Sequence, residues 1–236
     1  MSSMGKIRSQ AKQYNRPWSK RLFVTTFGFT HYPLLVTVFM LYTNCMRTII
    51  LASASPRRKE LLRRIGLEFR VSTAHTDEVC DARLAPRECT KALARHKAEC
   101  VAHYHPDDLI IAADTIVVLG NDILNKPVDA GDARRMLRRL SGKCHTVITA
   151  YTILDAASGK SRTRAVESLV WFRKLTSHEI EAYIKTGEPF DKAGAYGIQE
   201  FGALLVKKID GDYFNVMGLP IASVAQTLKE FGIVVL

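Results

Sequence analysis

Two uniformly apolar runs lie near the middle of the chain, at residues 109–113 and 116–119, and only Asp114 and Thr115 separate them. Runs of this kind are typical of a strand that is buried on both faces. From Arg47 onward, strand-like runs alternate with segments of helical periodicity, and this alternation predicts a mixed α/β fold without internal repeats. We expect the buried strand to be interrupted at Asp114 and Thr115.

Local signals place further elements around this strand. Ser55 is expected to cap a helix that has Pro56 in its first turn, and Asp129 is expected to cap a later one. Thr176 followed by Glu179 predicts a capping box for another helix. Helices are predicted at residues 56–65, 86–103, 129–140 and 176–187, and after Pro220. Strands are predicted at residues 48–52, 145–154, 164–172 and 203–209, of which the middle two form an antiparallel hairpin.

The first 46 residues differ from the rest of the chain, because they carry six Lys and Arg residues and no Asp or Glu. Residues 22–46 are uncharged, but His31 and Pro33 weaken a membrane-spanning helix. We therefore predict an N-terminal extension at residues 1–45 and a folded domain at residues 46–236. The extension is interpreted as dispensable, as a transit or signal segment, or as a membrane anchor.

Charge and cysteine content do not decide between the possible functions. The whole chain has a formal charge of +11, of which +5 remains on the 190 residues after the extension. Such a basic excess suits a phosphate-rich small ligand as well as a nucleic acid. The five cysteines form no C-x-x-C pair and no typical zinc spacing, so we interpret them as reduced thiols in a cytoplasmic protein.

The segment from residue 51 to 58 predicts a phosphate-binding loop. A strand leads through Ser53 and Ser55 into a helix whose first turn holds Arg57 and Arg58. Exposed backbone N–H groups, hydroxyls and guanidinium groups together form a natural anion site. An ordinary capped helix with solvated arginines would have the same sequence.

Other polar residues are candidates for chemistry. Asp114 follows an apolar run, where a carboxylate is costly unless it meets a cation, a metal or a proton-transfer task. Lys97 shares a helical face with apolar residues, so it either snorkels to solvent or serves a site. Lys126 is a loop lysine that could contact phosphate, and Asp77 and Glu78 could bind a divalent cation or only decorate a loop.

These segments together resemble the Maf family of house-cleaning nucleotide pyrophosphatases, from about residue 47 to the C-terminus. The order of the motifs carries the resemblance more than any one of them. The motifs are Ser53-Ala54-Ser55-Pro56-Arg57-Arg58, Asp77-Glu78, Ala94-Arg95-His96-Lys97-Ala98, Ala113-Asp114-Thr115-Ile116-Val117, Lys126-Pro127, residues 191–199 and Asn215-Val216-Met217-Gly218-Leu219-Pro220.

The resemblance implies a fold and a set of roles. It implies a mixed sheet with flanking helices and two lobes around a central nucleotide-binding cleft, and a divalent cation such as Mg, Mn or Co. By position, Asp114 would be the general base and, with Glu78, a metal ligand. Ser53, Arg58, Lys97 and Lys126 would bind the triphosphate, and Arg57, Thr115 and Gln199 match the positions that select the nucleotide.

The same three positions resemble the branch that hydrolyses dTTP and UTP to the monophosphate and pyrophosphate. The expected partner is thus a nucleoside triphosphate substrate. A homodimer is an option, and neither nucleic-acid binding nor a stable membrane association is expected. A cytoplasmic location is expected, with organellar targeting by residues 1–45 as the alternative. Residues 1–45 have no counterpart in the family pattern, and Asn125 replaces the glycine often found before the lysine.

Two rival functions stay open at this point. A nucleotidyltransferase also begins with a strand and a basic phosphate loop, but it normally needs several glycines where this chain has Ser53, Ala54 and Ser55. A non-catalytic nucleic-acid-binding or cell-division regulatory protein would use the basic surface, and its DNA affinity would outlast removal of Asp114 and Glu78. The sequence contains no Walker loop, dinucleotide fingerprint or H-E-x-x-H motif.

Overall fold

The structure is a computed structural model that describes residues 47–73 and 83–236. Residues Arg47–Leu236 form one unit. The predicted extension and Glu78 lie outside the described residues. No helix in the described part is both long enough and apolar enough to cross a membrane.

A mixed sheet runs through the described residues, as expected. Its strands follow the order β2-β1-β3-β5-β6-β7, and β4 pairs with β3. The strand β1 is parallel to both of its neighbours, whereas the other pairings are antiparallel. The strands are β1 (Ile49–Leu51), β2 (Arg70–Val71), β3 (Leu109–Leu119), β4 (Asp122–Leu124), β5 (Cys144–Asp155), β6 (Ser161–Phe172) and β7 (Val206–Asp210).

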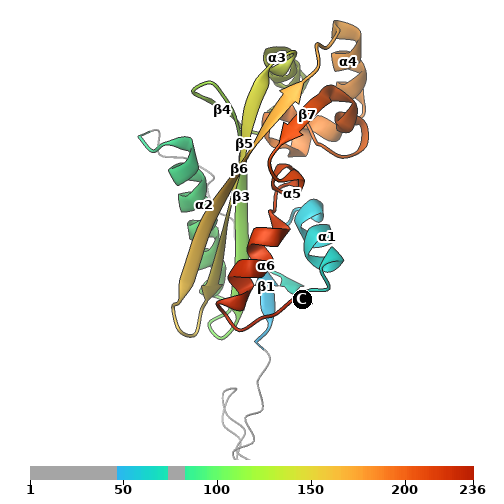
Figure 1. Ribbon diagram of the computed structural model, residues 1–236. Coiled ribbons are helices and arrows are strands. Elements are labelled where there is room, and N and C mark those ends of the chain that lie inside the picture. Colours follow the sequence, from blue (N-terminus) through green and yellow to red (C-terminus); the bar gives the residue numbers. More distant parts are fainter. Residues whose placement is uncertain (1–46, 74–82) are drawn as a thin grey trace, which may run out of the picture. The chain divides into compact units, whose positions relative to one another are not determined.

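Helices cover both faces of this sheet (Figure 1). The helix α2 packs along β3 and β5 on one face, while α1, α5 and α6 lie on the other. The α-helices are α1 (Pro56–Arg64), α2 (Pro86–Ala102), α3 (Ala130–Leu140), α4 (Ser177–Lys185), α5 (Tyr213–Met217) and α6 (Ile221–Lys229). Three 3-10 helices follow α4, at η1 (Glu188–Asp191), η2 (Ala193–Ala195) and η3 (Glu200–Leu205).

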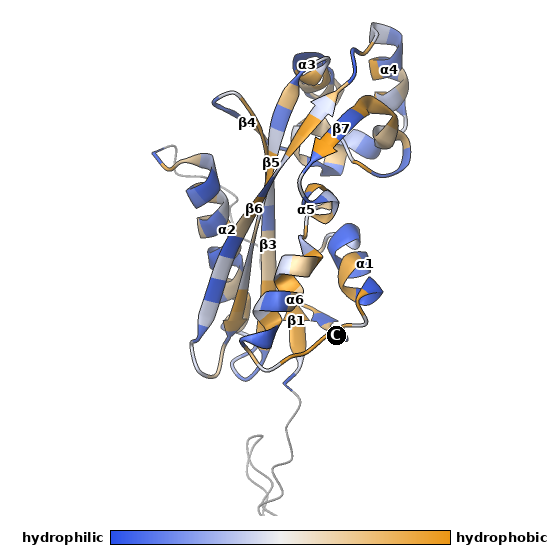
Figure 2. Cartoon of the chain, viewed as in Figure 1, coloured by the Kyte–Doolittle hydropathy of each residue, from blue (hydrophilic) through white to orange (hydrophobic). Residues whose placement is uncertain are grey.

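The buried side chains divide into two lobes that share the long strands β3 and β5. At one end, apolar residues of β1, β3 and β5 pack against α1 and α6 on one face and against α2 on the other. The mainly apolar colour of β1 and of much of α6 marks this lobe in Figure 2. At the other end, α3 and α4 enclose a separate core with β6 and the segment after η1. The expected two-lobed α/β architecture is confirmed.

The predicted interruption of the central strand is wrong. The strand β3 is continuous from Leu109 to Leu119, and Asp114 and Thr115 pair in register with Ala150 and Thr149 of β5. Strand pairing uses backbone groups, so polar side chains do not end a strand when they find polar partners. The two polar residues therefore lie in the middle of the central strand, between the two lobes.

Two of the three predicted helix caps are present, whereas the predicted start of the last strand is wrong. The Asp129 side chain accepts a hydrogen bond from the Asp132 backbone N–H, and the Thr176–Glu179 capping box is present. Ser55 occupies the N-cap position of α1 but makes no side-chain capping bond, which contradicts the expected cap. The predicted strand at residues 203–209 begins instead as η3, and β7 starts only at Val206.

Candidate functional site

A cleft of about 750 Å³ lies where the two lobes meet, a volume that suits a small organic ligand. Its walls come from the β1–α1 loop, the middle of β3, α2, the loop after β4, the segment after η1 and the end of α5. Five cationic and two carboxylate side chains line it, giving a net charge of +3: Arg57, Arg58, Lys97, Lys126, Lys192, Asp114 and Asp191. The cleft therefore favours a polyanion.

The β1–α1 loop forms the first wall. The strand β1 ends at Leu51, and Pro56 begins α1, so the N–H groups of the first helical turn have no partner within the helix. The Ser53 hydroxyl is buried and accepts a hydrogen bond from the Ser55 backbone N–H at 3.3 Å. This arrangement has the features of an anion site at a helix N-terminus.

Arg58 is the centre of the hydrogen bonds on this wall. Its Nε donates to the Gly218 carbonyl at 2.9 Å, and its Nη1 donates to the Ala113 carbonyl at 2.9 Å and to Ser53 Oγ at 3.1 Å. Its Nη2 donates to Thr115 Oγ1 at 3.0 Å. The guanidinium group thus joins α1, β3 and the end of α5. In this structure Arg58 organises the wall, in addition to any contact with phosphate.

Asp114 lies in the cleft opposite a lysine from α2. Its Oδ1 is 2.5 Å from Lys97 Nζ, and the two side chains are only 10% and 14% exposed. The apolar neighbours of Lys97 on α2, Leu93 and Val101, also line the cleft, so this helical face turns toward the site. A nearly buried carboxylate is tolerated here because a cation lies beside it.

The opposite wall comes from the end of η1 and the segment after it. Asp191 bridges two cations, since its Oδ2 is 3.1 Å from Arg57 Nη1 and its Oδ1 is 2.6 Å from Lys192 Nζ. Burial would raise the pKa of Asp191, but the hydrogen bond from Lys192 and the charges of Arg57 and Lys192 outweigh it and lower that pKa. Asp191 is therefore an ionised bridge between the walls.

Glycine fixes the path of this segment. Gly194 has φ +69°, and a Cβ at this position would lie 3.0 Å from the Val117 side chain. Its N–H donates to the Asn125 carbonyl at 3.1 Å, which places the segment next to the loop that carries Lys126. A Cβ at Gly197 would lie 2.8 Å from Lys192 Cε. The motif glycines thus allow both Val117 and the lysine stem to pack closely.

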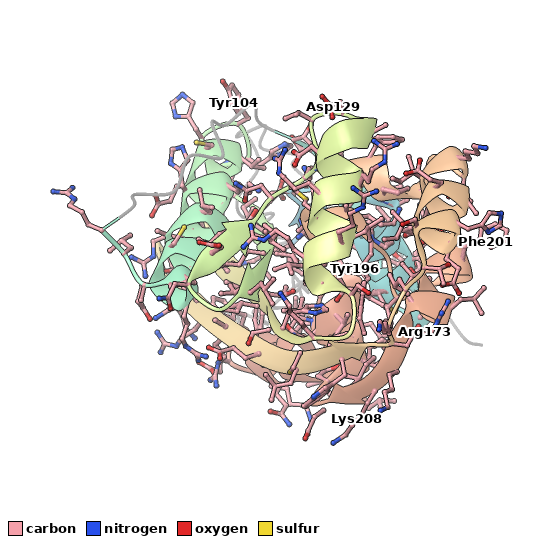
Figure 3. All side chains as sticks on the ribbon, turned by 90° about the horizontal axis from the view of Figure 1, so that it is seen from above. Tyr104, Asp129, Arg173, Tyr196, Phe201 and Lys208 are labelled. Atoms are coloured by element: carbon pink, nitrogen blue, oxygen red, sulfur yellow. The ribbon has the colours of Figure 1, made fainter. Side chains whose placement is uncertain are left out.

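The structure brings most of the predicted site residues together. Ser53, Arg57, Arg58, Lys97, Asp114, Thr115 and Lys126 all line the cleft. Gln199 does not line it, although the preceding Ile198 does, and nearby Phe201 points outward (Figure 3). Glu78 lies outside the described residues. Asp191 and Lys192 had no assigned role, although the glycines around them indicated close packing.

The described residues offer few metal ligands. Among them, no group of three or more His, Cys, Asp and Glu side chains could hold an ion by itself. The Asp114 carboxylate nevertheless faces a cleft suited to phosphates. Magnesium is commonly held by one or two carboxylates together with substrate phosphate oxygens, so Asp114 fits a cation that arrives with a nucleotide.

One cysteine differs from expectation. Cys89 lines the cleft and is disulfide-bonded, so the interpretation of all five cysteines as reduced thiols is wrong at this position. Cys100 and Cys144 are free thiols, as expected. Spacing alone could not show this bond, because disulfide pairing depends on the fold.

Comparison with known proteins gives consistent matches. A family model described as Maf-like protein matches residues 48–231. A dTTP/UTP pyrophosphatase of Pelotomaculum thermopropionicum is 47% identical over 187 residues, which cover 79% of this chain and 98% of that protein. A dTTP/UTP pyrophosphatase of Clostridioides difficile is 48% identical over 183 residues, covering 78% and 94%.

Solved structures are less similar. A HAM1 protein from Coxiella burnetii aligns with a TM-score of 0.42 and 15% identity, covering 78% of this chain and 100% of that chain. At these values the likeness adds nothing to the fold described above.

Proposed function

The chain belongs to the Maf-like protein family, and from this premise we propose that it is a nucleoside triphosphate pyrophosphatase that hydrolyses dTTP and UTP. The products are the nucleoside monophosphate and pyrophosphate. One observation supports this proposal above the others. A nearly buried ion pair, Asp114 and Lys97, lines a cleft whose charged side chains have a net charge of +3.

The chemistry assigned to these residues begins with binding. A triphosphate repels an incoming nucleophile until its charge is neutralised, and the cations of the cleft serve that purpose. Asp114 then accepts a proton from a water molecule as the water oxygen attacks the α-phosphorus. The bond from the α-phosphorus to the oxygen that bridges to the β-phosphate breaks, and pyrophosphate leaves with the electron pair.

Lys97 has two tasks in this scheme. It holds Asp114 Oδ1 in position, and its ammonium group can also donate to a phosphate oxygen of the nucleotide, because lysine has three N–H donors. We propose that Asp114 and Glu78 hold a divalent cation, Mg, Mn or Co, which supplies further charge neutralisation at the phosphates when bound.

The activity is tested with a nucleotide panel. The purified full-length protein is incubated with dTTP, UTP, CTP and GTP, and pyrophosphate, monophosphate and orthophosphate are measured separately. We expect pyrophosphate and monophosphate in equal amounts from dTTP and UTP. Release of orthophosphate with a diphosphate would instead indicate a different hydrolase. Binding without turnover would support the nucleic-acid or regulatory alternative.

The assigned role of Gln199 gives a specificity prediction. A glutamine amide offers a donor and an acceptor, which match the acceptor, donor, acceptor edge of thymine or uracil. Because Gln199 lies outside the cleft lining, this role requires the segment after Ile198 to move inward when a nucleotide binds. We expect Gln199→Glu to reduce the preference for UTP over GTP about tenfold while changing kcat for UTP less. Measured kcat/KM values for both nucleotides check this.

Glu200→Gln is the matched control, because it makes the reverse change at the next, exposed residue. The control should keep the wild-type ranking of nucleotides. A Gln199→Glu protein with that same ranking would show that Gln199 does not read the base.

The extension gives a second prediction. We propose that residues 46–236 are the catalytic domain, since the family match begins at residue 48. A chain shortened to begin at Met46 should remain soluble and keep kcat/KM within about twofold of the full chain, because no predicted site residue precedes Ser53. An insoluble or inactive shortened chain would place the extension in the working fold. Cytoplasmic location, organellar targeting and a homodimer stay predictions.

A further inference from the structure

Two hydroxyl groups, of the half-buried Thr115 and the buried Thr149, carry a chain of hydrogen bonds from the cleft into the sheet. Arg58 Nη2 is 3.0 Å from Thr115 Oγ1, and Thr115 Oγ1 is 3.0 Å from Thr149 Oγ1 on the neighbouring strand β5. Thr149 Oγ1 in turn is 2.8 Å from the backbone carbonyl of Asn215 in α5. Thr149 and Asn215 are fully buried. The chain therefore crosses from α1 to α5 through two strands, with only its first part at the cleft.

The far end of this chain is rigid. The Asn215 side chain accepts a hydrogen bond from the Thr149 backbone N–H at 3.2 Å. Its Nδ2 donates to the Val147 carbonyl at 3.0 Å and to Ser168 Oγ at 2.9 Å. Asn215 is thus held on both sides, and its backbone carbonyl presents a fixed acceptor to Thr149.

The directions of the hydrogen bonds follow from the atoms. A carbonyl has no hydrogen, so Thr149 must donate its only hydroxyl hydrogen to Asn215. In the contact between the two hydroxyls, Thr149 therefore accepts and Thr115 donates. Arg58 has only donors, so it donates to Thr115. The Thr115 hydrogen points away from the cleft, toward β5.

This direction determines what Thr115 can offer a ligand. Thr115 lines the cleft, yet its hydroxyl hydrogen is already committed, so its Oγ1 can present only a lone pair there. Uracil and thymine carry a hydrogen on N3, which an acceptor can bind. Cytosine has an unprotonated N3, which would face a lone pair with no hydrogen between them. An acceptor at this position favours uracil and thymine and disfavours cytosine.

We propose that Thr149 is a positioning residue for nucleotide specificity, because it fixes Thr115 as a hydrogen-bond acceptor in the cleft. This inference rests on the proposed pyrophosphatase activity. Thr149 itself does not line the cleft. Thr149 acts through Thr115, and it needs its own hydroxyl group to accept the Thr115 hydrogen.

The experiment compares UTP with CTP, which differ only at the pyrimidine edge. Thr149→Val keeps the shape of the side chain and removes its hydroxyl, so the Thr115 hydrogen loses its acceptor and becomes available to the cleft. We expect the ratio of kcat/KM for UTP over that for CTP to fall about tenfold, because one hydrogen bond changes its direction. Thr149→Ser keeps the hydroxyl and should keep the wild-type ratio.

Thr152→Val is the matched control. Thr152 lies on the same strand, is equally buried, and its hydroxyl contacts Thr163 at 2.9 Å, outside the cleft lining. Its replacement should affect stability without changing the ratio. If Thr149→Val does not fold, Thr149→Ala replaces it, because alanine also lacks the hydroxyl but adds no bulk.

The possible outcomes distinguish a failure of the proposed pyrophosphatase function from a failure of the inference about Thr149. A wild-type protein that hydrolyses no nucleotide would contradict the proposed function itself. An active wild-type protein together with a Thr149→Val protein that loses activity equally toward UTP and CTP would overturn the inference, since Thr149 would then only support the fold. A changed ratio in Thr149→Ser or Thr152→Val would overturn it as well.

Discussion

Replacing Asp114 by asparagine should lower kcat for dTTP by roughly a hundredfold to ten-thousandfold, the usual contribution of a general base. Asparagine has the shape of aspartate and can still accept a hydrogen bond from Lys97, so the cleft and nucleotide binding should persist. It cannot accept the proton of the attacking water. Steady-state kinetics of pyrophosphate release, together with nucleotide binding measured by calorimetry, check both parts of this prediction.

Asp155→Asn is the control for this substitution. Asp155 is also buried and ion-paired, with its Oδ2 2.6 Å from Arg47 Nη1, but it lies outside the cleft lining. Its replacement should cost stability and leave kcat near the wild-type value. Turnover of the Asp114→Asn protein within threefold of wild type would refute the assignment of the base.

The Arg58→Lys protein should be less stable than wild type by on the order of 3 kcal/mol, although the charge is unchanged. Arg58 donates to Gly218, Ala113, Ser53 and Thr115 from three nitrogen atoms of a planar group. A lysine has one nitrogen and cannot reach acceptors in that many directions. Urea unfolding in the absence of nucleotide measures this effect without any contribution from substrate binding.

The control is Arg134→Lys, which makes the same change in an arginine bound to Glu181 between α3 and α4. This pair lies at the surface, so its loss should cost much less stability than the loss of the Arg58 hydrogen bonds. If Arg58→Lys were as stable as wild type and only its KM rose, Arg58 would be a phosphate ligand with no organising role.

Local features of the fold could be predicted from the sequence. The Asp129 cap, the Thr176–Glu179 capping box and the hairpin of β5 and β6 each depend on residues close together in the chain. The position of Asp114 was harder to predict. Its polarity indicated a break in the strand, whereas pairing with β5 keeps the strand continuous. That pairing depends on residues more than thirty positions away.

In the candidate site, too, some features could be predicted from the sequence and others depend on contacts between distant residues. Motif order identified Ser53, Lys97 and Asp114 as neighbours, and the cleft contains all three. The sequence predicted that Arg58 binds phosphate, but its acceptor in Gly218 is 160 positions away, so its organising role is visible only in three dimensions. The same is true of Thr149, because the direction of a hydroxyl hydrogen depends on every neighbour it has.

The central claim is that water attacks the α-phosphorus of the nucleotide and releases pyrophosphate. Hydrolysis of dTTP by the full-length protein in water enriched in oxygen-18, followed by mass spectrometry of both products, tests it directly. Attack at the α-phosphorus places one labelled oxygen in dTMP and none in pyrophosphate. Label in pyrophosphate would mean attack at the β-phosphorus, and labelled orthophosphate with dTDP would mean attack at the γ-phosphorus; either result would contradict the proposed mechanism.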